Sequence, residues 1–502
     1  TLHYWSKTYP RGFDLHTRAT YAPFVALPIF NNLVSFDPKM SELRPENIIG
    51  DLAEHWEISP DGKTYTFYLV KNAKWHDGKP FTAADVVYSI EKIVDPDPKR
   101  SRIYNSFPSF RNIEKVDDYT VDIHLKYPAA SLLTQLAGPY AIIQPKHLAG
   151  TDGNTTDFLV GTGPFMFKNY TAPVVFELVR NPNYFKKGLP FLDGIKITFV
   201  SDVSTQVDVL VTNRVDMSSP SLAYKQKEQV DRITAEAPGV KIQYLYFPYC
   251  YAFWVNMNFP PFQDIRVRRA LSLMIDPTEM TLAGYGATEF GLTGRAYFPD
   301  PWKMDKSESY KIMRWDKSFE ERVTEAKKLM AEAGYSNGFK DKVRIITTYN
   351  PDFERMIATF ADHALKYLNV ETDIITTDVT KTRQLRDTGQ FDLILTMAYS
   401  LTGDLDEYAG SFVTGGEGNF GDYSNPILDR LFEEESWTTD LPRRIEIGHE
   451  IERIILTELP ILPTGVTFTY VIASHPHVRD LTPGFSGYSQ AHLRMEYVWL
   501  DK

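Results

Sequence analysis

Two groups of acidic side chains in this sequence could do acid–base chemistry. A glycosidase needs two carboxylates about 5 Å or about 6.5–9.5 Å apart across a cleft, and Asp404 with Asp406, or the run 433–435, could supply such a pair. The run 433–435 is typical of a solvated helix face. In contrast, Asp404 and Asp406 sit in a Gly-containing loop directly after an expected strand, which is where α/β proteins place their ligands. We therefore expect ligand contact at Asp404 and Asp406.

Other catalytic and metal-binding patterns lack the residues that their chemistry needs. No His pair has the HExxH spacing of a zinc site, and no Gly-x-Ser-x-Gly nucleophile elbow is present. Cys250 lies in an aromatic run, where burial raises a thiol pKa and keeps the thiol inert. The segment 161–165 lacks the Lys-Ser/Thr of a phosphate-binding loop and indicates a tight turn. We expect no enzyme, metal or cofactor; a glycoside hydrolase or amidase is the remote alternative.

The N-terminal third of the chain predicts a sheet of hairpins followed by a helix. Ser59-Pro60-Asp61-Gly62 is a turn sequence, and apolar residues alternate through the strand expected at 64–69. Thr82 with Asp85 forms a capping box that predicts a helix ending before Pro96. A second hairpin is expected around 116–125, followed by a helix at 129–137.

In the second half of the sequence, strands and helices alternate. Ser318 with Glu321 forms a capping box, and Gly334 closes that helix as a left-handed residue. We expect, in order, a strand at 343–348, a helix at 352–367, a strand at 370–376, a helix at 379–388 and a strand at 391–396. This βαβ alternation predicts an α/β fold in which helices cover a sheet.

Composition excludes several classes of protein. The 502 residues are 43% hydrophobic and 24% charged, which is enough for a large core without disulfides or metals. A net charge of −11 supplies no basic surface for nucleic acid or anionic lipid, so neither is expected as a partner. No run approaches the eighteen or so apolar residues of a membrane helix. A first residue that is not Met is consistent with a secreted protein whose signal peptide was removed.

Several motifs occur in the order found in one family. They are 49–56 with 61–67, 74–89, 161–165 with 180–184, 256–271 and 331–335. Together they resemble the extracellular solute-binding proteins of oligopeptide and nickel ABC importers, which form bacterial solute-binding family 5 (periplasmic binding protein class II, cluster C).

The resemblance implies a two-lobed periplasmic binding protein fold with an extra N-terminal α+β domain in the first lobe. The implied boundaries are 1–36, 156–249 and 466–502 for lobe I, 37–155 for the extra domain, and 250–465 for lobe II. The two lobes would close over a small organic solute, since a ligand that contacts both lobes favours the closed state. The implied protein is a periplasmic monomer of a Gram-negative bacterium that delivers solute to ABC transporter permease subunits.

The same resemblance implies a set of ligand-binding residues. Asn31, Asn32 and Leu33 match an early pocket strand, and Trp254 stands where oligopeptide binders can carry a ligand-facing acid, with Ala252 on the same strand face. An indole there favours stacking on a ring, sugar or aliphatic group, the alternative being a core Trp. The full implied set is Asn31, Asn32, Leu33, Tyr104, Ala252, Trp254, Asn256, Tyr399, Ser400, Leu401, Asp404 and Asp406.

One position departs from the pattern of peptide binders. The Asp that pairs with a peptide's α-ammonium falls, by alignment, at Leu401. A buried ammonium needs a carboxylate partner. Two explanations therefore stay open: Asp404, Asp406 or another acid replaces the missing Asp, or the ligand is not an ordinary peptide. A peptide or peptide-like solute is the main expectation. An oligosaccharide, an opine-like sugar conjugate, and a nickel or haem carrier are the alternatives.

Overall fold

The computed structural model describes residues 1–17, 25–40, 43–97, 103, 107–220, 223–397, 400, 402–482 and 490–501. These residues form two compact units, one of 1–245 with 470–502 and one of 246–469. The predicted lobe II, 250–465, falls inside the second unit, and the predicted extra domain, 37–155, falls inside the first. Its status as a separate domain remains a prediction. Among the described residues, no helix is long and apolar enough to cross a membrane.

The first unit contains two four-stranded sheets, two strand pairs and five α-helices in its described part. One sheet has the order β1-β10-β9-β8 (Leu2–Ser6, Gly194–Phe199, Val175–Arg180, Phe165–Thr171), and the other has the order β4-β5-β7-β6 (Ala53–Ile58, Thr64–Leu69, Thr120–Leu125, Phe110–Asp117). The pairs are β2 (Val34–Phe36) with β3 (Ile48–Gly50), and β16 (Val478–Arg479) with β17 (Trp499–Leu500). The helices are α1 (Ala83–Ile93), α2 (Leu132–Leu136), α3 (Val203–Val211), α4 (Lys227–Glu236) and α14 (Gln490–Leu493).

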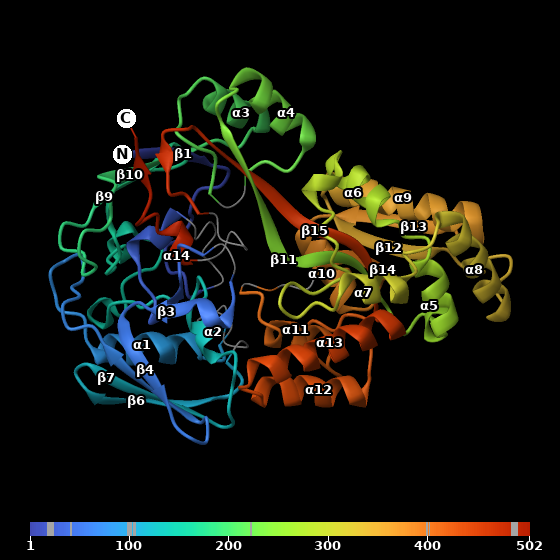
Figure 1. Ribbon diagram of the computed structural model, residues 1–502, viewed down its shortest axis with the longest axis horizontal. Helices are drawn as coiled ribbons and strands as arrows, with labels where there is room; N and C mark the ends of the chain where they lie inside the picture. The colour runs from blue at the N-terminus through green and yellow to red at the C-terminus, as the bar shows by residue number, and fades with distance from the viewer. Residues whose placement is uncertain are drawn as a thin grey trace. The chain divides into compact units, whose positions relative to one another are not determined.

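The predicted hairpin and helix near the N-terminus are confirmed. In β5 the alternate residues Tyr65, Phe67 and Leu69 are buried, so one face of this sheet forms a core. The capping box of Thr82 and Asp85 begins α1, whose apolar face covers that sheet (Figure 1). The predicted helix at 129–137 is shorter, and forms α2.

The second unit is one mixed five-stranded sheet with helices on both faces. Its strand order is β13-β12-β14-β11-β15 (Thr372–Thr377, Val343–Thr348, Leu393–Met397, Lys241–Val255, Ile461–Ser474). The helices are α5 (Ile265–Ser272), α6 (Pro277–Tyr285), α7 (Lys306–Met313), α8 (Phe319–Glu332), α9 (Pro351–Leu368), α10 (Val379–Asp387), α11 (Asp406–Phe412), α12 (Pro426–Trp437) and α13 (Leu441–Glu458). β12 runs parallel to both β13 and β14, which confirms the predicted βαβ alternation.

Alternate residues of β11 pack on opposite faces of this sheet. Phe253 contacts Phe360 of α9, with ring centroids 4.6 Å apart, whereas Trp254 belongs to a buried cluster that includes Ile447 of α13. Figure 1 shows α9 and α13 on opposite sides of the sheet. The sheet is therefore the middle layer of the unit, in agreement with the predicted α/β fold in which helices cover a sheet.

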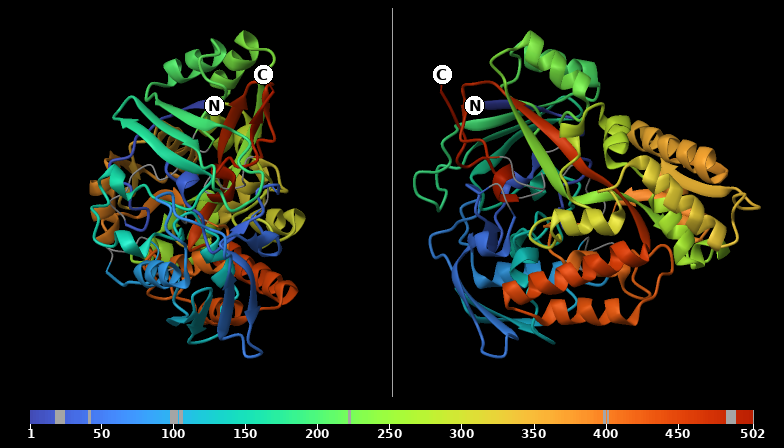
Figure 2. Two further views of the ribbon diagram at one scale, coloured as in Figure 1. Left: turned by 90° about the vertical axis from the view of Figure 1, so that its left-hand side faces the viewer. Right: turned by 45° about the vertical axis from the view of Figure 1, so that its right-hand side comes forward.

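Two long strands contain the boundaries between the units. β11 and β15 are neighbours in the sheet, and the right-hand view of Figure 2 shows the two long strands next to each other. The division at 245/246 falls within β11, and the division at 469/470 falls within β15. The chain therefore passes from one unit to the other through paired strands, and not through loops.

A buried group of charges ties the C-terminal segment to the first unit. Arg494 donates to Asp51 at 2.5 Å, and both side chains are fully buried. Lys186 completes the group, since it lies 2.8 Å from Asp51 and 3.2 Å from Glu496. Two cations thus face two anions, and their attraction offsets the cost of removing them from water.

Replacing Arg494 by Met should strongly destabilise the first unit. The change leaves Asp51 buried without its guanidinium partner, which typically costs about 3–5 kcal/mol. Arg479→Met is the matched control because Arg479 pairs with Asp501 at 2.8 Å on the surface, and exposed pairs contribute at most about 1 kcal/mol. Urea unfolding of the two variants measures the difference, and equal losses would contradict this account of the buried group.

Candidate functional site

The candidate site in the second unit is the loop that follows the carboxyl end of β14. Residues 402–405 of this loop, with Ser400, lead into α11. In α/β proteins the carboxyl ends of parallel strands carry the ligand-binding loops. Ser400 and Asp404 were predicted from the sequence to contact ligand, and the structure places both in this one loop. We call its described residues, 400 and 402–405, the β14 loop.

Glu407 holds the first half of the β14 loop. Its Oε2 atom accepts hydrogen bonds from Ser400 Oγ at 2.5 Å, from the Thr402 backbone N–H at 2.9 Å and from Thr402 Oγ1 at 3.0 Å. Burial raises the pKa of Glu407, and the hydrogen bonds from Ser400 and Thr402 oppose that rise. Glu407, which lies in α11, therefore holds the loop that precedes this helix.

Arg444 of α13 holds the second half of the β14 loop. Its two Nη atoms donate to both oxygens of Asp404, at 2.5 and 3.1 Å. The guanidinium also lies over the ring of Trp302, 4.8 Å from its centroid. Trp302 in turn donates from Nε1 to the Gly403 carbonyl at 2.8 Å. Arg444 therefore fixes the loop directly at Asp404, and indirectly at Gly403 through Trp302.

A second carboxylate also faces Arg444 and corrects the sequence analysis. The run 433–435 was predicted to be a solvated helix face, and this is wrong for Glu435, whose side chain is 0% exposed and lies 2.5 Å from Arg444 Nη2. Helical periodicity explains the difference, since positions 433 and 434 point to solvent while position 435 points toward α13. Asp406 lies 3.9 Å from the same Nη2 atom.

Glu452 of α13 fixes the segment that carries Trp302. Its carboxylate accepts from the backbone N–H groups of Tyr297, Phe298 and Met304, at 2.6–3.2 Å. Burial raises the pKa of Glu452 to about 7, and the three N–H donors oppose this rise. The indole that supports the β14 loop is thus itself held by a buried carboxyl group.

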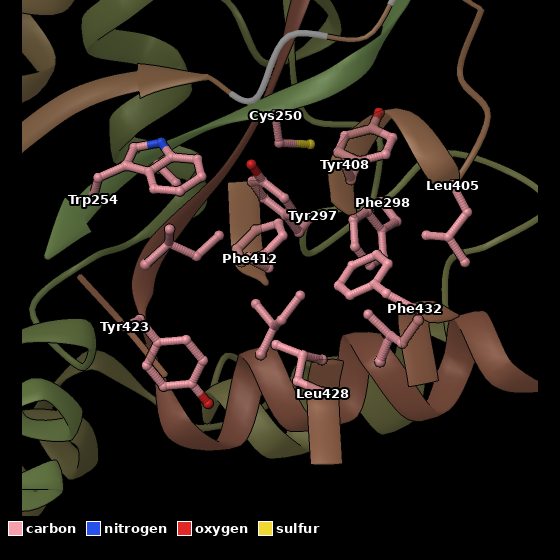
Figure 3. Packing of buried hydrophobic residues seen from close by; sticks show 14 of the residues in the cluster. Cys250, Trp254, Tyr297, Phe298, Leu405, Tyr408, Phe412, Tyr423, Leu428 and Phe432 are labelled. Atoms are coloured by element: carbon pink, nitrogen blue, oxygen red, sulfur yellow. The ribbon is translucent and has the colours of Figure 1, made fainter. Parts of the chain in front are cut away.

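Trp254 lies in the core of the second unit. Figure 3 shows it at one end of the buried aromatic cluster, and its ring stacks on Phe412 at a centroid distance of 5.4 Å and an interplanar angle of 21°. It is 2% exposed, and Ala252 of the same cluster is 0% exposed. These are the contacts of a core residue. The predicted ligand contacts of Trp254 and Ala252 therefore remain predictions.

Asn256 lies at the other end of β14. Its side chain donates to the Phe391 carbonyl at 2.7 Å, just before β14 begins, whereas Ser400 follows the end of this strand. The five residues of β14 lie between these two ends, and a strand rises about 3.3 Å per residue. The structure therefore does not bring Asn256 to the β14 loop.

The predicted pocket residues of the first unit are buried and bonded within that unit. Asn31 donates from Nδ2 to Asp51 at 2.9 Å and to Tyr184 Oη at 3.2 Å, and Asn32 donates to the Leu136 and Gly138 carbonyls. Leu33 is 0% exposed. Their contact with ligand remains a prediction.

The sequence predicts a tight turn at 161–165, and the structure shows a bend at 162–164 that leads into β8. Gly163 donates its backbone N–H to the Ile29 carbonyl at 2.8 Å. A Cβ atom on Gly161 would lie 1.8 Å from the same carbonyl oxygen, so only glycine fits there. Cys250 is buried with a raised pKa, also as predicted. Tyr104, Tyr399 and Leu401 fall outside the described residues.

Sequence reasoning missed the residues that hold the β14 loop. They are Arg444, Glu407, Trp302 and Glu452. A lone Arg or Glu in an amphipathic helix carries no motif, so only its position on the apolar face could have marked it as buried. Among the described residues, no group of three or more His, Cys, Asp or Glu side chains is arranged to hold a metal ion.

Replacing Trp254 by Ala should destabilise the second unit by about 3–5 kcal/mol, because the change removes a buried indole from a packed cluster. Trp437→Ala is the control, since Trp437 is 47% exposed, and it should cost less than about 1 kcal/mol. Urea unfolding of ligand-free protein measures both. Unchanged stability of Trp254→Ala, together with weaker solute binding, would place the indole on the ligand and contradict its core role.

Comparisons with known proteins agree with this architecture. The family model described as "Bacterial extracellular solute-binding proteins, family 5 Middle" matches residues 47–420. Heme-binding protein A of Haemophilus influenzae is 27% identical and aligns with 98% of this chain and 90% of its own. Di/tripeptide-binding protein 1 of Pseudomonas aeruginosa is 26% identical, with 93% and 89% of the two chains aligned.

Solved structures confirm the predicted α/β fold of the two-lobed periplasmic binding proteins. The ABC transporter substrate-binding protein CtaP of Listeria monocytogenes superposes with a TM-score of 0.83, at 22% identity, over 100% of this chain and 99% of that one. AgaA of A. tumefaciens, solved with agropinic acid, superposes with a TM-score of 0.76, at 24% identity and the same coverage. From the family match over most of its length, this chain belongs to the bacterial extracellular solute-binding proteins of family 5.

Proposed function

We propose that this protein is the periplasmic substrate-binding component of an ABC importer and that its cargo is a small peptide or peptide-like solute. Relatives named for di- and tripeptides and for glutathione support this class of cargo. The protein acts as a monomer, is exported by a cleaved signal peptide, passes its solute to the permease subunits, and carries out no covalent chemistry. The β14 loop contributes to the solute site.

One observation narrows the ligand class: the described carboxylates at the β14 loop already have protein partners. Asp404 accepts from both Nη atoms of Arg444, and Glu407 accepts from Ser400 and Thr402. Asp406 lies 3.9 Å from Arg444 and accepts from Ser436 at 3.5 Å. A ligand ammonium at this loop would have to displace one of these partners.

This arrangement disfavours an ammonium anchor at the β14 loop. Displacing Arg444 from Asp404 would leave a buried guanidinium without its bidentate partner, which costs about 3–5 kcal/mol. The free energy gained from a new buried ammonium–carboxylate pair is largely cancelled by the cost of removing both charges from water. We therefore propose that the group of the solute next to this loop is uncharged or anionic. Peptides with a modified amino end fit this description, and oligosaccharides or opine-like sugar conjugates are the alternative cargo.

Calorimetric titration of refolded, ligand-free protein tests the proposal. The panel pairs di- and tripeptides with their N-acetyl forms, and adds oligosaccharides and opine-like conjugates. We expect acetylation to change the dissociation constant of a bound peptide by less than about threefold, because no carboxylate of the loop is available to the ammonium. A loss of about 100-fold or more, as expected for breaking a buried ion pair, would contradict it.

Two further outcomes bear on the class of cargo. Binding only to oligosaccharides or sugar conjugates would replace the peptide by the alternative cargo while leaving the transport role intact. Chemical change of any bound solute, followed by mass spectrometry over hours, would contradict a purely binding role.

A further inference from the structure

His76 of the first unit is hydrogen-bonded at both ring nitrogens to a segment that lies 85 residues later in the chain. The backbone N–H of Gly161 is 3.2 Å from Nδ1, and the carbonyl oxygen of Gly163 is 3.0 Å from Nε2. The backbone N–H of His76 also donates to the Gly161 carbonyl at 2.9 Å. Three hydrogen bonds thus join this one residue to residues 161–163, which we call the glycine bend.

The two ring contacts determine the protonation state of His76. A backbone N–H group can only donate and a carbonyl oxygen can only accept, so Nδ1 must be unprotonated and Nε2 must carry the hydrogen. The ring is therefore neutral, in the Nε2–H form. Protonation would place a hydrogen on Nδ1, which removes the acceptor of the Gly161 N–H group and sets two donors against each other.

The glycine bend in turn contacts the segment that contains the predicted pocket residue Asn31. Gly163 donates its backbone N–H to the Ile29 carbonyl at 2.8 Å, and Thr162 Oγ1 donates to Asn31 Oδ1 at 3.2 Å. At the other end of the same amide, Asn31 Nδ2 donates to Asp51 at 2.9 Å. Because the oxygen and the nitrogen of an amide need opposite partners, the Thr162 hydroxyl helps to fix the orientation of the Asn31 side chain.

We propose that His76 is a positioning residue for the solute site: its neutral ring holds the glycine bend, which in turn fixes Asn31 through Thr162. Protonation of the ring in acid releases the bend. The effect on solute binding rests on the proposed function and on the predicted contact of Asn31 with solute. The neutral state of the ring rests only on its own hydrogen bonds.

The charged groups around His76 lie on its own side of these contacts. Asp77 follows it in the chain and favours the protonated ring. Asp77 itself pairs with His147 at 2.7 Å and with Lys79 at 3.8 Å. The glycine bend and residues 28–31 contain no titratable side chain. The glycine bend therefore offers the ring hydrogen bonds but no charge.

The direction of the pKa shift agrees with a neutral ring. Loss of contact with water lowers the pKa of His76 to about 4, and the Gly163 carbonyl and Asp77 oppose this fall. A histidine whose pKa is lower in the folded state takes up a proton when its surroundings open. His76 should therefore stabilise the closed bend fully above about pH 6.5, and this contribution should be lost as pH falls toward about 4.

Amide hydrogen exchange of the ligand-free wild type tests the neutral ring without any variant. Opening of the glycine bend should be accompanied by uptake of one proton on His76. After correction for intrinsic rates, protection of the amides at 161 and 163 should fall by up to about tenfold per pH unit between about pH 6.5 and pH 4. Protection that does not depend on pH over this range would overturn the proposal.

His76→Gln identifies the group that titrates. Gln offers one acceptor and one donor, as the neutral ring does, but it does not titrate. The variant should therefore keep the protection of the glycine bend at neutral pH and lose most of its pH dependence. His55→Gln is the matched control, because His55 is exposed on β4 of the same unit, and it should follow the wild type. The same pH dependence in His76→Gln as in the wild type would assign the proton to another group and refute the role of His76.

Solute binding at neutral pH tests the positioning role. Using the tightest-binding solute of the peptide and sugar panel, we expect His76→Leu, which removes the acceptor of Gly161, to raise the dissociation constant about tenfold. His76→Gln should raise it by less than about threefold. Equal affinity of both variants and the wild type, or equal losses in both variants, would contradict the positioning role. Thr162→Val removes only the hydroxyl that donates to Asn31, and it should cause a similar loss of affinity if His76→Leu does not fold.

Failure of this proposal is distinguishable from failure of the proposed function. Hydrogen exchange uses protein without ligand, so it reports on His76 whether or not a solute is known. Absence of binding across the whole solute panel would instead count against the proposed function and leave the neutral state of His76 untouched.

Discussion

The ion pair between Arg444 and Asp404 is the interaction on which the candidate site depends. Its two hydrogen bonds, 2.5 and 3.1 Å long, join helix α13 to the β14 loop. Burying a guanidinium costs free energy unless its N–H groups have acceptors, so the position of the loop against α13 depends on this pair. Because Trp302 contacts both the guanidinium and the Gly403 carbonyl, the same pair also fixes the segment around residue 302. The described part of the loop is therefore fixed by the protein's own side chains, which would lower the entropic cost of binding at the proposed solute site.

The sheet of the second unit provides the rigid frame for this arrangement. β14 lies between β12 and β11, and its residues Leu393, Ile394 and Leu395 are buried. Trp254, which fills the space between β11 and α11 by stacking on Phe412, helps to hold α11 against the sheet. Glu407 of α11 accepts a hydrogen bond from Ser400 of the loop. A core aromatic residue and the β14 loop are thus linked through one short helix.

The sequence predicted the frame well and the contacts of the site poorly, for a physical reason. The structure confirms two kinds of local pattern: the capping boxes at Thr82 and Ser318, and the alternation of strands and helices from 343 to 397. The loop after β14 was also expected to be a ligand loop. The partner of Asp404, however, lies 40 residues away on a helix face, and no local spacing encodes that pairing. The same limit explains why Glu435 was assigned to solvent, since a run of three acids does not show which member faces a neighbouring helix.

A crystal structure of the protein with its tightest-binding solute would test the central claim most directly. We predict that the solute contacts the β14 loop through hydroxyl or backbone groups, while both Nη atoms of Arg444 remain on Asp404. A solute ammonium bound to Asp404, with Arg444 displaced, would show that the loop is built around a cationic anchor and would contradict the account.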